Sequence, residues 1–305
     1  MKKLVSKTKE KLDQMELFVP SAQELSLRDQ RDTMERPFLA LSKRRKTPID
    51  YRSPNGEVWV RVTPNMDHYV ASIHDWDYII VIASIMLANL NLGIQPSRTI
   101  RISAYELLKS AGRDTGGKAY KDLYAGLDRL TSTLVKTNIR RLQHQESKSF
   151  SFIDSWDFLC KGDNSKAQLQ ITISQWLYDG ICDKAYVLSV HPDYFSLTSG
   201  IKRFLYRTAR KHAGRDGALW QCSLKSLHEK SGSEMDIRDF KKYIKKSIID
   251  NDIPEYHLTF IEESEDAIEG VSFVHKKHKF YAEEIDKKTK LLLDLPNYNT
   301  LANQE

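Results

Sequence analysis

The stretch from residue 223 to 249, SLKSLHEKSGSEMDIRDFKKYIKKSII, carries the pattern that decides the fold. It predicts a short helix from Ser223 to Lys230, a break at Ser231-Gly232 and a longer helix from Met235 to Ile249. A glycine between two periodic segments favours a tight turn. Two helices joined in this way are typical of a helix-turn-helix motif, and the flanking segments indicate its winged form.

The flanking segments of this motif are one helix and three strands. The helix is opened by Asp193 and Ser196 and ends near Gly214. The strands are predicted at 220–222, 256–261 and 271–275.

The same order of elements is predicted earlier in the chain. We expect a buried helix over 75–92, a strand over 99–102, a capped short helix over 103–110, a longer helix over 117–133, and a hairpin of two strands over 135–142 and 147–152. At a constant offset of 120 positions, Ser103 matches Ser223, Leu107 matches Leu227 and Gly112 matches Gly232. These matches include the helix cap, a core leucine and the turn glycine, so they indicate an internal duplication.

The predicted fold class is therefore α+β, with two tandem winged helix-turn-helix domains related by an internal duplication. We expect a mobile N-terminal arm over 1–35, a first domain over 36–165, a second domain over 166–285 and a C-terminal tail over 286–305. The length of 305 residues fits two domains.

The longer helix of the second copy has two contrasting faces. Ile237, Phe240, Ile244 and Ile248 recur at helical spacing and predict a core-facing stripe. Four cations are expected on the other side, where they could contact DNA phosphates: Arg238, Lys241, Lys242 and Lys245. An ordinary solvated lysine face is the alternative interpretation.

Other candidate DNA-binding residues belong to three further segments. Lys118 and Lys121 lie on the longer helix of the first copy, beside acids, and Arg140 and Arg141 belong to its predicted wing. The first helix of the second copy contributes Arg203, Arg207, Arg210 and Lys211. The loop over 262–269 is acidic, so we exclude it from the DNA surface.

Charge placement favours a polyanion as the partner. The net charge of the chain is +6, and it is concentrated as +7 between residues 195 and 250 and +5 between 100 and 142. Phosphate neutralisation dominates the affinity of proteins for nucleic acids. No stretch is apolar for long enough to span a membrane and no secretory signal is visible, so we expect a cytoplasmic protein without a membrane partner.

Catalytic and metal-binding patterns are missing from the sequence. Three cysteines form no CxxC pair and are interpreted as buried thiols, and no P-loop occurs. Asp75 and Asp77 lie at the start of a predicted helix. Carboxylates at this end interact favourably with the helix dipole, so we interpret both as capping residues. His275 and His278 flank two lysines and are interpreted as surface residues. We therefore predict no metal, no cofactor and no enzymatic activity.

Several motifs, in a fixed order from about residue 35 to 280, resemble the plasmid replication initiator protein A family. They are Glu35-Arg36-Pro37-Phe38 through Arg44-Arg45, Ala71-Ser72-Ile73 to Asp75-Trp76-Asp77-Tyr78-Ile79-Ile80, Gly117-Lys118-Ala119-Tyr120 to Leu127-Asp128-Arg129-Leu130, Thr137-Asn138-Ile139-Arg140, Tyr194-Phe195-Ser196-Leu197 to Ala209-Arg210-Lys211-His212-Ala213-Gly214, and Lys230-Ser231-Gly232-Ser233. The resemblance implies binding of double-stranded plasmid origin DNA at repeated sites (iterons), opening of an adjacent segment, and recruitment of the host initiator and replicative helicase machinery. It also implies a switch between a monomer and a homodimer that limits copy number.

Two other functions remain open at this level. A transcriptional repressor, including one that acts on its own promoter, could use the same domains. A nicking enzyme would use one of the 14 tyrosines, but it would need a metal site that the sequence does not show.

Overall fold

The computed structural model describes residue 20 and residues 24–140, 147–159, 168–214, 219–264 and 267–277, without the side chains of 262–269. Helices and short antiparallel sheets alternate along the chain, so the α+β class is confirmed. Within these residues, no helix has the length and apolarity needed to cross a membrane.

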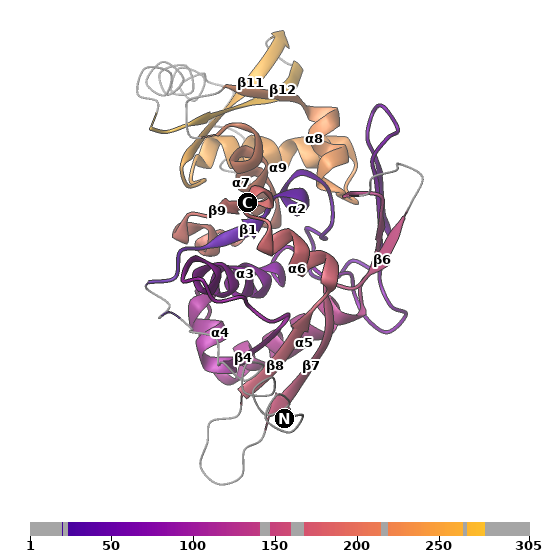
Figure 1. The fold of residues 1–305 in the computed structure, drawn as a ribbon. Helices are drawn as coiled ribbons and strands as arrows, with labels where there is room; N and C mark the ends of the chain where they lie inside the picture. Colours follow the sequence, from indigo (N-terminus) through magenta and orange to yellow (C-terminus); the bar gives the residue numbers. More distant parts are fainter. Residues whose placement is uncertain are drawn as a thin grey trace, which may run out of the picture.

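A first unit is formed by three helices and a three-stranded sheet in the lower part of Figure 1. Its elements are α3 (Trp76–Asn91), β4 (Thr99–Ser103), α4 (Ala104–Ser110), α5 (Gly117–Ser132), β7 (Ile153–Leu159) and β8 (Gln168–Ile173). The strands lie in the order β4-β8-β7. The predicted capping box is present, because Ser103 and Glu106 each accept from the backbone N–H of the other.

A second unit in the upper part of Figure 1 has the same order of elements. Its elements are α7 (Gly200–His212), β10 (Trp220–Ser223), α8 (Leu224–Ser231), α9 (Ile237–Asp250), β11 (Tyr256–Ser264) and β12 (Ala267–His275). The strand order β10-β12-β11 corresponds to that of the first unit. The two turn glycines adopt nearly the same left-handed conformation, with φ of 63° at Gly112 and 61° at Gly232.

The start of the second unit differs from the prediction. The segment opened by Asp193 and Ser196 forms a short 3-10 helix, η2 (Pro192–Ser196), and α7 begins only at Gly200. Ser199 caps α7 by accepting from the N–H of Lys202.

The predicted hairpin forms, because its two strands pair antiparallel, but its place in the first unit was wrong. Its two strands, β5 (Leu134–Thr137) and β6 (Lys148–Phe150), belong to a separate sheet with β2 (Ile49–Arg52) and β3 (Trp59–Thr63), in the order β2-β3-β5-β6. The hairpin of the first unit is instead β7–β8. Strand β8 pairs antiparallel with β4 on one edge and with β7 on the other, and Leu169, Ile171 and Ile173 lie on its buried face.

The N-terminal segment is not a mobile arm over its described part. β1 (Arg28–Gln30) pairs with β9 (Val187–Ser189), and α2 (Arg31–Glu35) contacts α7. Figure 1 shows these elements between the two units, next to α6 (Gln175–Cys182), which η1 (Lys184–Tyr186) follows. Asp29, Asp32 and Met34 are buried there, so β1 and α2 pack into the folded part of the chain.

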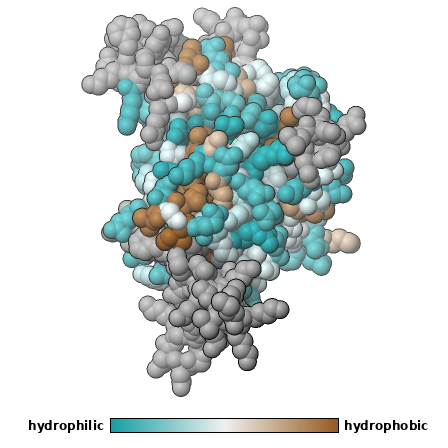
Figure 2. Space-filling view, viewed as in Figure 1, coloured by the Kyte–Doolittle hydropathy of each residue, from teal (hydrophilic) through white to brown (hydrophobic). Residues whose placement is uncertain are grey.

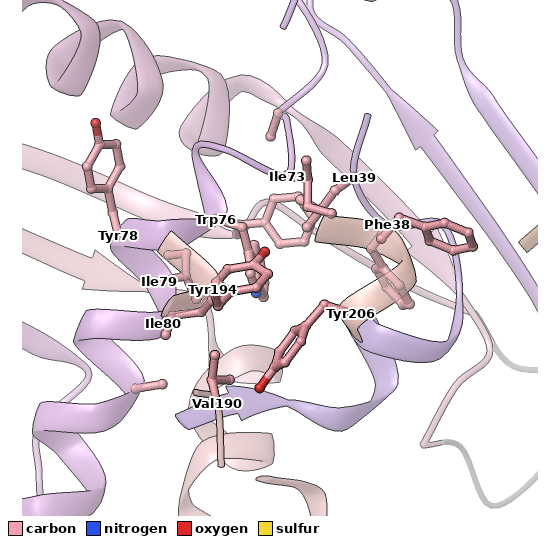
Figure 3. Close-up of a cluster of buried hydrophobic side chains, with 14 of the residues drawn as sticks. Phe38, Leu39, Ile73, Trp76, Tyr78, Ile79, Ile80, Val190, Tyr194 and Tyr206 are labelled. Carbon is pink, nitrogen blue, oxygen red and sulfur yellow. The ribbon is translucent and has the colours of Figure 1, made fainter. Parts of the chain in front are cut away.

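The aromatic centre of the core joins the elements of both units. Figure 3 shows Trp76, Ile79 and Ile80 of α3 beside Tyr194 and Tyr206, which come from η2 and α7. All five side chains are buried. The outer surface is different: Figure 2 shows a mostly hydrophilic face, with its largest group of hydrophobic residues left of centre and smaller groups near the top and the right edge. The contact of Trp76, Ile79 and Ile80 with the two tyrosines buries apolar surface between the two units, which stabilises their association.

The cysteine and histidine predictions had mixed outcomes. Cys222 is buried and Cys182 is half-buried, and both are free thiols; Cys160 lies outside the described residues. His275 was predicted at the surface, but it is buried in β12 against the ring of Tyr256. His278 also lies outside the described residues.

Candidate nucleic-acid interface

Helix α9 is held in one orientation by its apolar face. Phe240, Ile244 and Ile248 are buried as predicted, and the ring of Phe240 packs edge-on against His228 of α8 at 4.9 Å. Asp236 caps the helix by accepting from the N–H of Asp239 at 2.9 Å, and these backbone donors lower the pKa of the Asp236 carboxyl. Ile237, the first residue of the predicted stripe, is 45% exposed because it lies in the first turn, beyond the contact with α8.

The opposite face of α9 is cationic. Arg238 and Lys242 are exposed, whereas Lys241 and Lys245 are half-buried along its sides. Lys242 forms an exposed ion pair with Asp239 at 2.8 Å, which raises the pKa of the lysine. The other three cations form no ion pair with a described residue, so their charges are available to a ligand.

Sequence reasoning missed two residues of this face. Lys246 and Tyr243 are exposed, and Lys246 follows Lys242 by one helical turn. The spacing of four residues would have found Lys246. With Lys246, five cations lie on the sides and the outer face of α9.

Helix α5 occupies the corresponding place in the first unit. Leu123, Leu127 and Leu130 bury its inner face, and Lys118 and Lys121 are exposed on the first two turns. Neither lysine is paired with a described residue. Asp122 is exposed beside them, so the charge of this face is weaker than that of α9.

The four cations predicted on α7 all contact other parts of the protein. Arg203, Arg207 and Arg210 are buried, and each is bound inside the protein. Arg207 donates to Asp29 and Thr33 at 2.8 Å each, and Arg210 donates to Ser189 at 2.7 Å. Lys211 lies 3.4 Å from Glu35. These side chains fix the N-terminal segment and β9 onto α7, which helical spacing alone could not reveal.

Arg203 is bound to the first unit. It forms an ion pair with Asp77 of α3 and donates to the carbonyls of Leu197 and Phe195. Arg113, in the turn between α4 and α5, donates to the second oxygen of Asp77 at 2.5 Å. Asp77 therefore connects both units instead of capping its helix.

Asp75 is the N-cap residue of α3, but its carboxylate makes no side-chain cap hydrogen bond and binds Arg129.

Arg140 does not lie on a wing. Its side chain extends between Trp176 and Tyr186, with its guanidinium 4.0 Å from the centre of the Trp176 ring, and donates to Asp32 at 2.6 Å. Gly180 permits this path, because a Cβ there would lie 2.2 Å from the guanidinium. Arg141 and the tip of the β7–β8 hairpin lie outside the described residues.

Comparisons with known proteins identify the class of protein as a replication initiator. The family model "Replication initiator protein A" matches residues 28–258. The chain therefore belongs to the replication initiator protein A family. This family consists of DNA-binding replication initiators rather than classical enzymes.

One named relative and two solved structures are similar to this chain. A protein of Wigglesworthia glossinidia brevipalpis named "Putative replication protein" is 30% identical over 241 residues, which cover 77% of this chain and 85% of that protein. Among solved structures, domains 2 and 3 of RctB match with a TM-score of 0.59 at 12% identity, over 85% of this chain and 99% of that one. The Pi initiator protein in complex with iteron DNA matches with a TM-score of 0.44 at 17% identity, over 76% of this chain and 98% of that one.

Proposed function

We propose that this protein initiates plasmid replication by binding repeated double-stranded sites (iterons) at an origin. In this proposal it promotes opening of the origin and recruits the host initiator and replicative helicase machinery. It acts in the cytoplasm, as a DNA-binding protein without enzymatic activity. Family membership supports the role in initiation, and the cationic outer face of α9 is the observation that carries the DNA contact.

The two units act as winged helix-turn-helix domains that arose by duplication. Their shared element order, strand order and turn glycines support this assignment. In such domains the second helix of the motif enters the major groove. That helix is α5 in the first unit and α9 in the second.

The two units contribute differently to binding. Arg238, Lys241, Lys242 and Lys245 of α9 are the principal DNA-binding residues, and base reading is concentrated there. Lys118 and Lys121 of α5 contact the phosphate backbone, since phosphate contacts position a protein without reading sequence. We leave Arg203, Arg207, Arg210, Lys211 and Arg140 out of the DNA-binding surface, because each of them binds another part of the protein.

A footprint of the full chain on plasmid DNA flanking its own gene tests this proposal. Several protected direct repeats are the expected result. One protected palindrome at the promoter would indicate the repressor function instead. Incubation with supercoiled origin DNA and Mg²⁺ should leave the DNA neither nicked nor covalently tagged, and a relaxed product would contradict the non-enzymatic mechanism.

A further inference from the structure

The four-stranded sheet β2-β3-β5-β6 has an outer face that the contacts of the two units do not use. The sheet lies along one side of the molecule (Figure 1, at β6). An open hollow of about 690 Å³ lies over β2, β3 and β5. Val60, Val62 and Val135 point to the buried side of this sheet, so the alternate residues form the outer face.

The outer face carries more cations than acids. Arg61 is opposite Asp50 on one neighbouring strand and opposite Lys136 on the other. Arg61 and Asp50 lie 3.4 Å apart, and both are more than half exposed. Arg52 and Lys136 are exposed and form no ion pair with any described residue. One acid therefore faces three cations, which complements an anionic ligand.

An aromatic ring lies among these charges. Trp59 is directly opposite Arg52 and lines the hollow. Its backbone is held by Asn138, which accepts from the N–H at 3.0 Å, and by Thr137, which donates to the C=O at 2.7 Å. Its indole N–H has no acceptor among the described residues. The position of Trp59 is thus fixed, while its ring and its donor remain available.

We propose that this outer face binds single-stranded nucleic acid, with an unpaired base stacked on Trp59 and phosphates contacting Arg52, Arg61 and Lys136. A duplex presents phosphates, but its base faces are covered by stacking, so it would leave Trp59 unused. Four-stranded sheets that carry an aromatic residue and cations use this chemistry in known single-strand readers. An acidic protein would satisfy the cations without requiring the ring.

The inference rests on the proposed function, because opening of an origin produces a single strand next to the bound repeats. The sheet face is separate in sequence from α9, so the two kinds of binding can be removed independently. Arg52→Ala with Lys136→Ala changes two exposed side chains of the sheet. Lys241→Ala with Lys245→Ala changes only α9 and is the matched control.

The test measures the affinity of the full chain for a labelled oligothymidylate of about 16 nucleotides and for a duplex carrying one repeat. For the single strand, substitution of Arg52 and Lys136 should reduce the slope of log affinity against log salt concentration by about 0.7 per lost contact. Duplex binding should stay unchanged. Trp59→Leu should weaken single-strand binding about tenfold, whereas Trp59→Phe should retain most of it. Thermal unfolding of both Trp59 variants checks that they fold equally well.

Three results would overturn the inference. These are unchanged single-strand affinity in the Arg52 and Lys136 variant, an equal loss of duplex binding in it, and displacement of the strand by polyglutamate as effectively as by oligothymidylate of equal charge. If the unmodified protein fails to bind the duplex but binds the single strand through this face, the proposed function is wrong and the inference holds.

Discussion

The buried carboxylate of Asp77 in α3 is paired with Arg203 of α7, and this ion pair joins the first unit to the second. Both side chains are almost completely inaccessible to solvent. Arg113 adds a second contact from the turn that leads to α5. The positions of the two motifs are therefore coupled through one carboxylate.

Replacement of Arg203 by alanine should strongly destabilise the protein. It would leave the charge of Asp77 buried with one partner fewer, and such a loss costs about 3–5 kcal/mol. Urea denaturation measures the change in the free energy of unfolding. Lys225→Ala, at an exposed position of α8, is the control and should shift it by less than about 0.5 kcal/mol. Equal denaturation midpoints for the two variants would show that the ion pair between Asp77 and Arg203 does not stabilise the protein.

Removal of the ring of Phe240 should unfold the second unit more readily. The side chain is fully buried between α8 and α9, so Phe240→Ala should cost about 3–5 kcal/mol. Ile237→Ala, on the same helix but 45% exposed, should cost much less. The same denaturation experiment compares the two, and similar costs would mean that the faces of α9 are assigned wrongly.

The turn glycine of the second unit should tolerate no side chain. Gly232 has a φ of 61°, and a Cβ there would lie 2.7 Å from Pro37 and 3.1 Å from Ile49. Gly214 has a comparable φ of 51° with no described atom near its Cβ position. Gly214→Ala should therefore show only the backbone strain, about 1 kcal/mol, and Gly232→Ala a larger loss of stability. Equal losses of stability in the two variants would indicate that Pro37 moves away from the new Cβ without destabilising the protein.

Stability should fall as the pH is lowered from about 6.5 towards 4. Burial lowers the pKa of His212, which is stacked on Trp220 at 4.3 Å, to about 4. The unfolded chain then binds more protons than the folded protein in this window, so folding is disfavoured there. His212→Phe, which keeps an aromatic ring, should remove about 1 kcal/mol of the decrease between pH 7 and 5, after allowance for partial exposure. Identical pH profiles of the free energy of unfolding would contradict this assignment.

Local patterns predicted much of the two units and little of what joins them. The Ser103 cap, the turn glycine Gly232 and three of the four inner-face residues of α9 were correctly predicted, because each depends on residues within one or two turns. The roles of Arg207 and Arg210 were missed, because Asp29 lies 178 positions from Arg207 in the chain and no periodicity indicates such a pairing. The position of β5 beside β3 was missed for the same reason.

Because of these long-range contacts, the DNA binding of the two units is best compared in the full chain. Separation of the second unit would expose Arg203 and Arg207 of α7, whose partners lie in α3 and the N-terminal segment. Substitutions in the full chain are therefore the better comparison. Lys118→Ala with Lys121→Ala should weaken binding to repeat and scrambled duplexes alike, as expected for backbone contacts. A loss confined to the repeat would assign base reading to α5.

The proposed contact between the cations of α9 and DNA phosphates can be tested by the salt dependence of duplex binding. Affinity for a repeat-containing duplex is measured over a range of salt concentrations for the full chain, for Lys241→Ala with Lys245→Ala, and for Lys184→Ala, an exposed lysine outside both units, as the control. We expect the double variant to bind more weakly, with a slope of log affinity against log salt that is smaller by about 0.9 for each lost contact. A slope equal to that of the unmodified protein would show that Lys241 and Lys245 are only solvated and do not contact DNA.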